Sequence, residues 1–127
     1  MITPVSFSAR RVFVSPNKKV GDATASELAQ TINSAYNVAS KQLNDKDLKP
    51  LFPVSGKAMI EKNPFCFNKE KKLTETGKNA FNSVNEKLGV TTDSTIGQYS
   101  KAIQKYITTY YDLGYEKNVC RLFDVLI

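Results

Sequence analysis

No histidine occurs among the 127 residues of this chain, and only two residues are cysteine. Without histidine the protein lacks the commonest general base and metal ligand, and it cannot form Ser-His or Cys-His nucleophile pairs. Two thiols cannot supply the four thiolate or imidazole ligands of a zinc site, and they are too few for a disulfide framework. We therefore expect a non-catalytic protein with no cofactor and no metal site, in a reducing compartment such as the cytoplasm.

Phosphate-binding motifs are missing as well. GKN at residues 77–79 resembles the end of a phosphate loop, but asparagine stands where serine or threonine is required. Lys72 also stands where the first glycine of that loop would have to be. SGKA at residues 55–58 fails in the same way.

The remaining residues that could catalyse a reaction or bind a metal ion belong to no specific motif. Asp45 and Asp47 could present two carboxylates to a divalent cation, although a charged stretch after a helix is typically a solvated terminus. An enzyme built on carboxylates would need them to meet a third acid, such as Glu61.

Cys66 lies between two phenylalanines. Burial there would raise its pKa and make it inert, whereas exposure near the following lysines would favour the thiolate, and we favour burial.

Long apolar runs are absent too, since none approaches the ~20 residues that span a bilayer. We therefore expect no membrane association. Residues 1–21 contain four basic residues and no acid, a composition that organellar transit peptides share. Pro4 and Pro16 disfavour the amphipathic helix that such peptides form. We expect the segment to belong to a mature cytoplasmic protein.

Arginine is scarce, with three residues against 15 lysines in a chain of net charge +6. The positive charge gathers in residues 1–20 and 51–78 and not along the expected helices. Arginine is the preferred side chain for bidentate phosphate and guanine contacts, so the charge is a weak indication of nucleic-acid binding. As an alternative function we retain nucleic-acid binding by two basic patches, which would have to converge in space. Their residues are Arg10, Arg11, Lys18, Lys19, Lys69, Lys71 and Lys72.

Helical periodicity is the clearest pattern that is present. Residues 24–43 place apolar side chains at steps of three and four, which predicts a helix with one buried face. Thr24 and Glu27 have the spacing of a capping box at its start. Four of the apolar positions are alanine, so a neighbouring helix could approach closely.

Two more helices are predicted further along the chain. One covers about residues 73–88, with Gly89 as its C-terminal stop. Gly77 would cost about 1 kcal/mol inside it, so the helix begins late, near Thr76, or another helix crosses there. The other runs from about 94 to 113 with Asp93 as N-cap. Residues 116–127 are consistent with a short terminal helix or a strand.

The fold class predicted from these patterns is mainly α, an irregular bundle of three to four helices. An extended basic arm, residues 1–20, precedes a single helical domain, residues 21–127. Residues 54–72 could hold a short strand or a single helical turn. The alternative is therefore an α+β fold, in which the N-terminal arm and residues 54–60 form a small sheet.

Five of the six tyrosines lie between residues 98 and 115. At ~100° per residue, Tyr99, Tyr106 and Tyr110 follow the centre of the apolar face of that helix, and Lys105 lies on the opposite side. A stacking platform for single-stranded nucleic acid needs aromatic rings and cations on one surface, so base stacking by this stripe is disfavoured. The three tyrosine hydroxyls lie on one line, and each must find a hydrogen-bond partner or reach water. We therefore favour a core face whose rim reaches water, with a partner-facing surface as the alternative.

The function predicted from this combination is a small protein-interaction module, acting as an adaptor, inhibitor or assembly subunit. We expect it to bind a protein partner, or a second copy of itself, through the N-terminal arm and the tyrosine-rich helix. Tyr111 lies off the stripe and Tyr115 follows a glycine, which makes them the better candidates for exposed contacts. The predicted partner-binding residues are Phe7, Arg10, Arg11, Phe13, Tyr111 and Tyr115.

Overall fold

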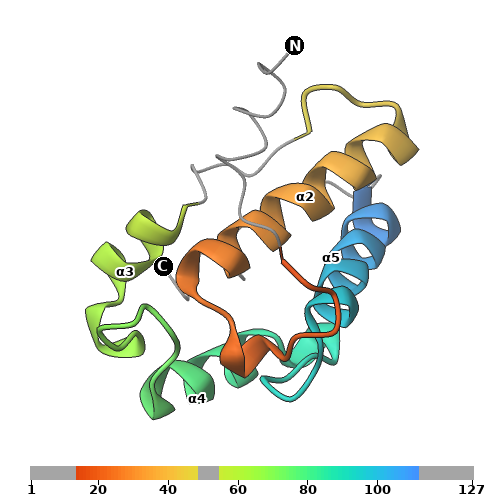
Figure 1. Ribbon diagram of the computed structural model, residues 1–127. Coiled ribbons are helices and arrows are strands. Elements are labelled where there is room, and N and C mark those ends of the chain that lie inside the picture. The colour runs from red at the N-terminus through yellow and green to blue at the C-terminus, as the bar shows by residue number, and fades with distance from the viewer. Residues whose placement is uncertain (1–13, 49–54, 112–127) are drawn as a thin grey trace.

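The computed structural model describes residues 14–48 and 55–111 of the chain (Figure 1). Within them lie four α-helices and three short 3-10 helices, and no sheet, so the predicted irregular helical bundle is confirmed. The α-helices are α2 (Ala25–Leu43), α3 (Gly56–Lys62), α4 (Glu75–Val84) and α5 (Ile96–Tyr110). The 3-10 helices are η1 (Val20–Asp22), η2 (Pro64–Cys66) and η3 (Glu86–Leu88).

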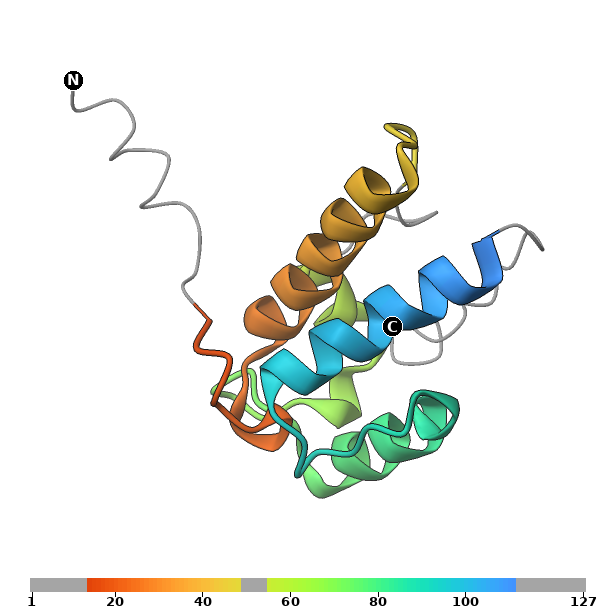
Figure 2. The same cartoon turned by 90° about the vertical axis from the view of Figure 1, so that its right-hand side faces the viewer.

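The two longest helices, α2 and α5, form the centre of the fold. They lie side by side and run in roughly the same direction, with α4 below their first turns (Figure 2). The alanines of α2 are fully or almost fully buried, as expected for a helix that another approaches closely. Phe81 of α4 is fully buried in the core, where its ring meets the Tyr99 ring edge-on at 5.1 Å between centroids.

The predicted start of α2 is confirmed in atomic detail. Thr24 Oγ1 accepts a hydrogen bond from the Glu27 amide (3.2 Å), and the Thr24 amide donates to Glu27 Oε1 (2.9 Å). Lys18 Nζ lies 3.1 Å from both carboxylate oxygens of Glu27. The helix ends at Leu43, and its C-cap residue Asn44 has a φ of 55°, in the left-handed region.

The predicted N-cap of α5 is wrong. Thr95, and not Asp93, caps the helix, because Thr95 and Gln98 form a second capping box. Asp93 lies in the preceding turn, where its amide donates to Thr91 Oγ1. A glutamine at N3 completes a capping box as glutamate does, and the pattern T-x-x-Q was present in the sequence.

The alternative α+β fold is wrong, because residues 56–62 form helix α3 and not a strand. Ser55 caps this helix by accepting a hydrogen bond from the Ala58 amide (3.1 Å). Pro64 follows the last turn, which limits the helix to seven residues. In the described part of the chain, β-type pairing is limited to three isolated bridges.

The last part of the predicted N-terminal arm belongs to the folded body. The amide of Ile96 donates to the Lys18 carbonyl (2.8 Å), and the Gly97 amide donates to the Pro16 carbonyl (3.0 Å). Val20 is fully buried. The segment from residue 14 to residue 20 therefore lies across the first turn of α5, while residues 1–13 and the predicted terminal helix fall outside the described residues.

None of the helices in residues 14–48 and 55–111 is long and apolar enough to cross a membrane.

Candidate protein-binding site

The tyrosine stripe of α5 changes from core to surface along the helix. The Tyr99 side chain is 4% exposed and packs in the core, where burial raises the pKa of its hydroxyl. Tyr106 is half-buried and packs against the edge of the core, and Tyr110 is 36% exposed. The predicted core face with a wet rim therefore describes Tyr99 and Tyr106, whereas Tyr110 reaches the surface.

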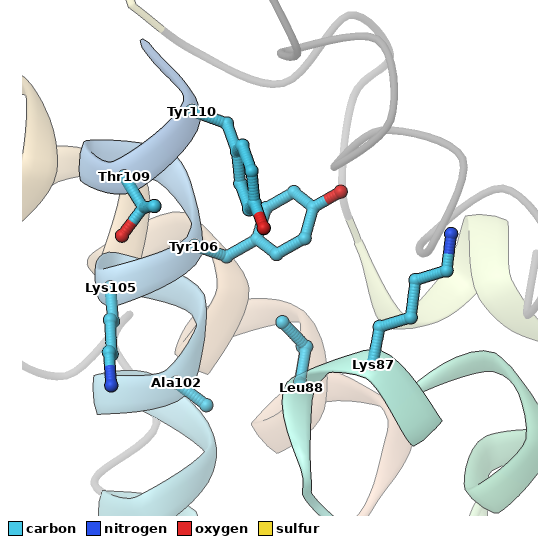
Figure 3. Close-up of a pocket in the computed structure, with 7 residues that line it drawn as sticks. All are labelled: Lys87, Leu88, Ala102, Lys105, Tyr106, Thr109 and Tyr110. Carbon is cyan, nitrogen blue, oxygen red and sulfur yellow. The ribbon is translucent and has the colours of Figure 1, made fainter.

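A groove lies where the exposed end of this stripe faces η3. Its volume is about 630 Å³, and Figure 3 shows its walls. The rings of Tyr106 and Tyr110 project from α5 toward Leu88 and Lys87 of η3. The lining residues are Lys87, Leu88, Ala102, Lys105, Tyr106, Thr109 and Tyr110.

The two tyrosines of the groove form one aromatic unit. Their ring centroids lie 4.8 Å apart and the ring planes are tilted by 53°. Tyr106 is held from behind by the core, so its ring supports that of Tyr110 and limits the rotamers of both. An aromatic pair fixed in this way loses little side-chain entropy when it contacts a partner.

The groove also carries two cations. Lys87 and Lys105 are exposed, and the lining contains no acidic residue. From helical position alone we expected Lys105 on the opposite side to the tyrosines. Lys105 borders the groove, but Figure 3 shows its side chain on the side of α5 away from the two rings, as expected. The cation on the side of the rings is Lys87 of η3.

Two residues of the groove could not be found by following one helix. Lys87 and Leu88 come from η3, and they meet α5 only through the tertiary packing of the two elements. The sequence signals near them were the place of Leu88 on the apolar face of the predicted helix and Gly89, which ends η3 in a left-handed conformation with φ 71°.

Tyr111 is not the exposed contact that we expected. It is half-buried and packs against the core, and its hydroxyl donates to Asp45 Oδ2. This hydrogen bond joins the last turn of α5 to the loop after α2, so Tyr111 has a structural role. Its role in partner binding stays a prediction, as does that of Tyr115, which lies outside the described residues.

The arm residues predicted to contact a partner cannot be placed. Phe7, Arg10, Arg11 and Phe13 lie outside the described residues, and their roles stay predictions.

One of the two lysine segments of the alternative function, residues 69–72, lies against the start of α2. The Ala25 amide donates to the Lys71 carbonyl (2.8 Å), and Thr24 forms an antiparallel bridge with Lys72. Lys69, Lys71, Lys72 and Lys19 are exposed, whereas the Lys18 ammonium is paired with Glu27. The convergence of the two lysine segments that this function requires stays a prediction.

Catalysis gains no support from the described residues. No three histidine, cysteine, aspartate or glutamate side chains of residues 14–48 and 55–111 come close enough to hold a metal ion, so Asp45, Asp47 and Glu61 do not converge. Cys66 is buried, as predicted, and burial raises the pKa of its thiol. Cys120 lies outside the described residues.

Comparisons with family models, with curated proteins and with solved structures found no significant match to this chain. Its function is therefore argued from its own residues.

Proposed function

We propose that this protein is a small non-catalytic interaction module, an adaptor, inhibitor or assembly subunit, that binds an acidic segment of a partner protein in the α5–η3 groove. The observation that carries the proposal is the Tyr106–Tyr110 pair, an aromatic unit at the surface in a groove that Lys87 and Lys105 help to line. The function class is the one predicted from the sequence, and the groove is the contact surface that we propose for it.

The walls of the groove suit an apolar anchor. Leu88 and Ala102 are half-buried and supply aliphatic surface, and the two rings supply flat apolar faces with polar tips. Tyrosine is enriched in protein interfaces because it provides a large contact area at low entropic cost. A volume of about 630 Å³ falls within the usual range of ligand sites and accommodates one large side chain of a partner.

The lysines determine the charge of the partner. Lys87 and Lys105 are opposed by no acid among the lining residues, so a segment with glutamates or aspartates beside its anchor would be attracted and oriented. Exposed ion pairs add little affinity, and most of the binding energy would come from contacts with the rings. In this proposal the N-terminal arm, with Phe7, Arg10, Arg11 and Phe13, contributes a second contact.

The test is a fluorescence-polarisation titration with a defined probe. The probe is a fluorescein-labelled, capped peptide with one tryptophan between two pairs of glutamates. We expect saturable binding that Tyr110→Ala weakens about fivefold or more, as for an interface residue worth above 1 kcal/mol. The double variant Lys87→Glu, Lys105→Glu should weaken it about threefold or more.

The matched control reverses two exposed lysines outside the groove, Lys57→Glu and Lys101→Glu, and should bind as the parent does. Equal loss in the control would mean that the probe reads net charge and not the groove. Dimerisation of the parent without probe, abolished by Tyr110→Ala, would assign the groove to a second copy and contradict the acidic partner.

A second candidate function is nucleic-acid binding. The observation that favours it is the turn that exposes Lys69, Lys71 and Lys72, which the start of α2 holds in place through Thr24 and Ala25. Arg10 and Arg11 of the predicted patch lie outside the described residues.

A further inference from the structure

Phe65 is the most exposed large apolar side chain in the described part of the chain. It is 83% exposed, against 39% for Val38 and 36% for Tyr110. A single exposed apolar residue is ordinary on a protein surface. Phe65 differs in how firmly its loop is held and in the lysine-rich turn that follows it in the chain.

Two hydrogen bonds from Thr74 hold the backbone at Phe65 and Cys66. Thr74 Oγ1 donates to the Phe65 carbonyl (2.8 Å), and the Thr74 amide donates to the Cys66 carbonyl (2.9 Å). The next two side chains, Cys66 and Phe67, are buried in the core. Because they fill the space below the loop, the Phe65 ring is held outward and cannot turn inward without displacing them.

The same loop ends in a turn rich in lysine. Asn68 Oδ1 accepts hydrogen bonds from the amides of Glu70 (2.9 Å) and Lys72 (3.0 Å), and the Asn68 amide donates to the Lys72 carbonyl (2.8 Å). Lys69, Lys71 and Lys72 are exposed, and Glu70 is the one acid between them.

Lys71 has a conformation that its side chain does not favour. Its φ of 67° lies in the left-handed region, where glycine and asparagine are usual. Unfavourable backbone conformations persist where the surroundings enforce them, and they are frequent at ligand-contacting sites. Here the Ala25 amide, which donates to the Lys71 carbonyl, fixes the turn against the start of α2.

We propose that residues 63–74 form a binding site for single-stranded nucleic acid, with a base stacked on Phe65 and phosphates on Lys69, Lys71 and Lys72. The inference rests on the second candidate function and shares no residue with the groove. A single strand offers exposed base faces, which suit one outward aromatic ring beside cations. A duplex hides those faces, and a bilayer would call for more apolar surface than one ring supplies. Lysine binds phosphate as a point charge, so the site has no preference for sequence.

The experiment is a polarisation titration of the full chain with fluorescein-labelled oligothymidine of about 12 nucleotides, over a salt series. We expect it to bind more tightly than a blunt duplex of the same length. Phe65→Ala should weaken binding about fivefold or more, without changing the dependence on salt. The triple variant Lys69→Gln, Lys71→Gln, Lys72→Gln should make the slope of log affinity against log salt shallower by about 2, at about 0.7 per phosphate.

Two controls match these variants. Val38→Ala removes another exposed apolar side chain, and the triple variant Lys41→Gln, Lys57→Gln, Lys101→Gln removes the same charge elsewhere. Both should bind as the parent does. Parent-like binding by Phe65→Ala, or equal loss in the lysine control, would overturn the site.

Other outcomes distinguish a failure of this binding site from a failure of the second candidate function. Oligothymidine binding that is lost only on substitution of Arg10 and Arg11 would keep the second candidate function and overturn this site. No binding at low salt would overturn both. Vesicles with about 30% phosphatidylserine serve as the membrane probe. Phe65-dependent binding to the vesicles, without oligonucleotide binding, would assign the loop to an anionic membrane surface instead.

Discussion

Gly77 lies directly against the carbonyl oxygen of Cys66. A Cβ atom at position 77 would stand 2.1 Å from that oxygen and 2.9 Å from Leu73 Cδ2. The first turn of α4 can therefore approach the loop that carries η2 only because residue 77 has no side chain. This contact explains a glycine inside a helix: another segment crosses there, and α4 also begins late, at Glu75 after the Thr74 cap.

The first prediction concerns this contact. Gly77→Ala should lower the free energy of unfolding by about 2 kcal/mol or more, because overpacking against backbone outweighs the gain of about 1 kcal/mol in helix propensity. Chemical denaturation of the two proteins measures the difference. Asn79→Ala, at an exposed position of the same helix, is the control and should change stability by less than about 0.5 kcal/mol. A stabilised Gly77→Ala variant would show that the helix and loop are further apart.

The second prediction concerns the link between the ends of α2 and α5. Tyr111→Phe removes the hydroxyl that donates to Asp45 and should cost about 1 kcal/mol, since the bond is half-buried and its acceptor is charged. A double-mutant cycle with Asp45→Ala should give a coupling free energy of similar size. Additive effects would mean that the bond contributes nothing. Because of this role, Tyr111→Ala is unsuitable for testing partner binding alone.

The third prediction is a pH dependence that comes from Glu27. Burial alone would raise the pKa of this carboxyl, but the Thr24 amide and the Lys18 ammonium outweigh it and hold the pKa below its ordinary value of 4.5. A lowered pKa stabilises the fold above the unfolded value, and this contribution is lost as the pH falls through the folded value. Glu27→Gln keeps a cap acceptor but cannot ionise, so it should cost about 1 kcal/mol at neutral pH.

Denaturation at a series of pH values checks this sign. The stability difference between the parent and Glu27→Gln should be constant above about pH 5 and shrink below the ordinary pKa. Lys18→Met should shrink the same acid-sensitive contribution, because it removes the ammonium while leaving the cap. A difference that grows as the pH falls would contradict a lowered pKa.

The fourth prediction concerns Cys66. Burial raises the pKa of its thiol, so iodoacetamide should alkylate it far more slowly than it alkylates a free thiol at about pH 8. A Cys120→Ser background isolates the measurement, and unfolding in denaturant should restore the ordinary rate. Rapid labelling in the folded protein would mean that the loop around η2 opens readily.

The sequence was most informative where periodicity and capping act locally. Helix α2, with its Thr24–Glu27 capping box, could be predicted because every determinant lies within one turn of the position it controls. The core position of Tyr99 followed from the helical period in the same way. Residues 56–62 were ambiguous because a run of seven residues is too short for period alone to separate helix from strand.

The candidate site was predicted only in part. Tyr106 and Tyr110 were on the predicted face, but Leu88 and Lys87 join them through packing between elements far apart in the chain. Tyr111 was predicted to be exposed, and its half-buried position could not be foreseen because its partner, Asp45, lies 66 residues away in sequence. Helical angle gives the direction in which a side chain leaves the backbone, and it cannot show which other segment lies there.

The most direct test of the proposed function is an NMR titration of the isotope-labelled full chain with the unlabelled acidic tryptophan peptide. We predict saturable amide shifts at the groove, on residues 87–88 and 102–110, that Tyr110→Ala reduces. Tyr111→Phe should leave them in place. Shifts confined to other parts of the chain, or none at saturating peptide, would contradict a protein-binding groove between α5 and η3.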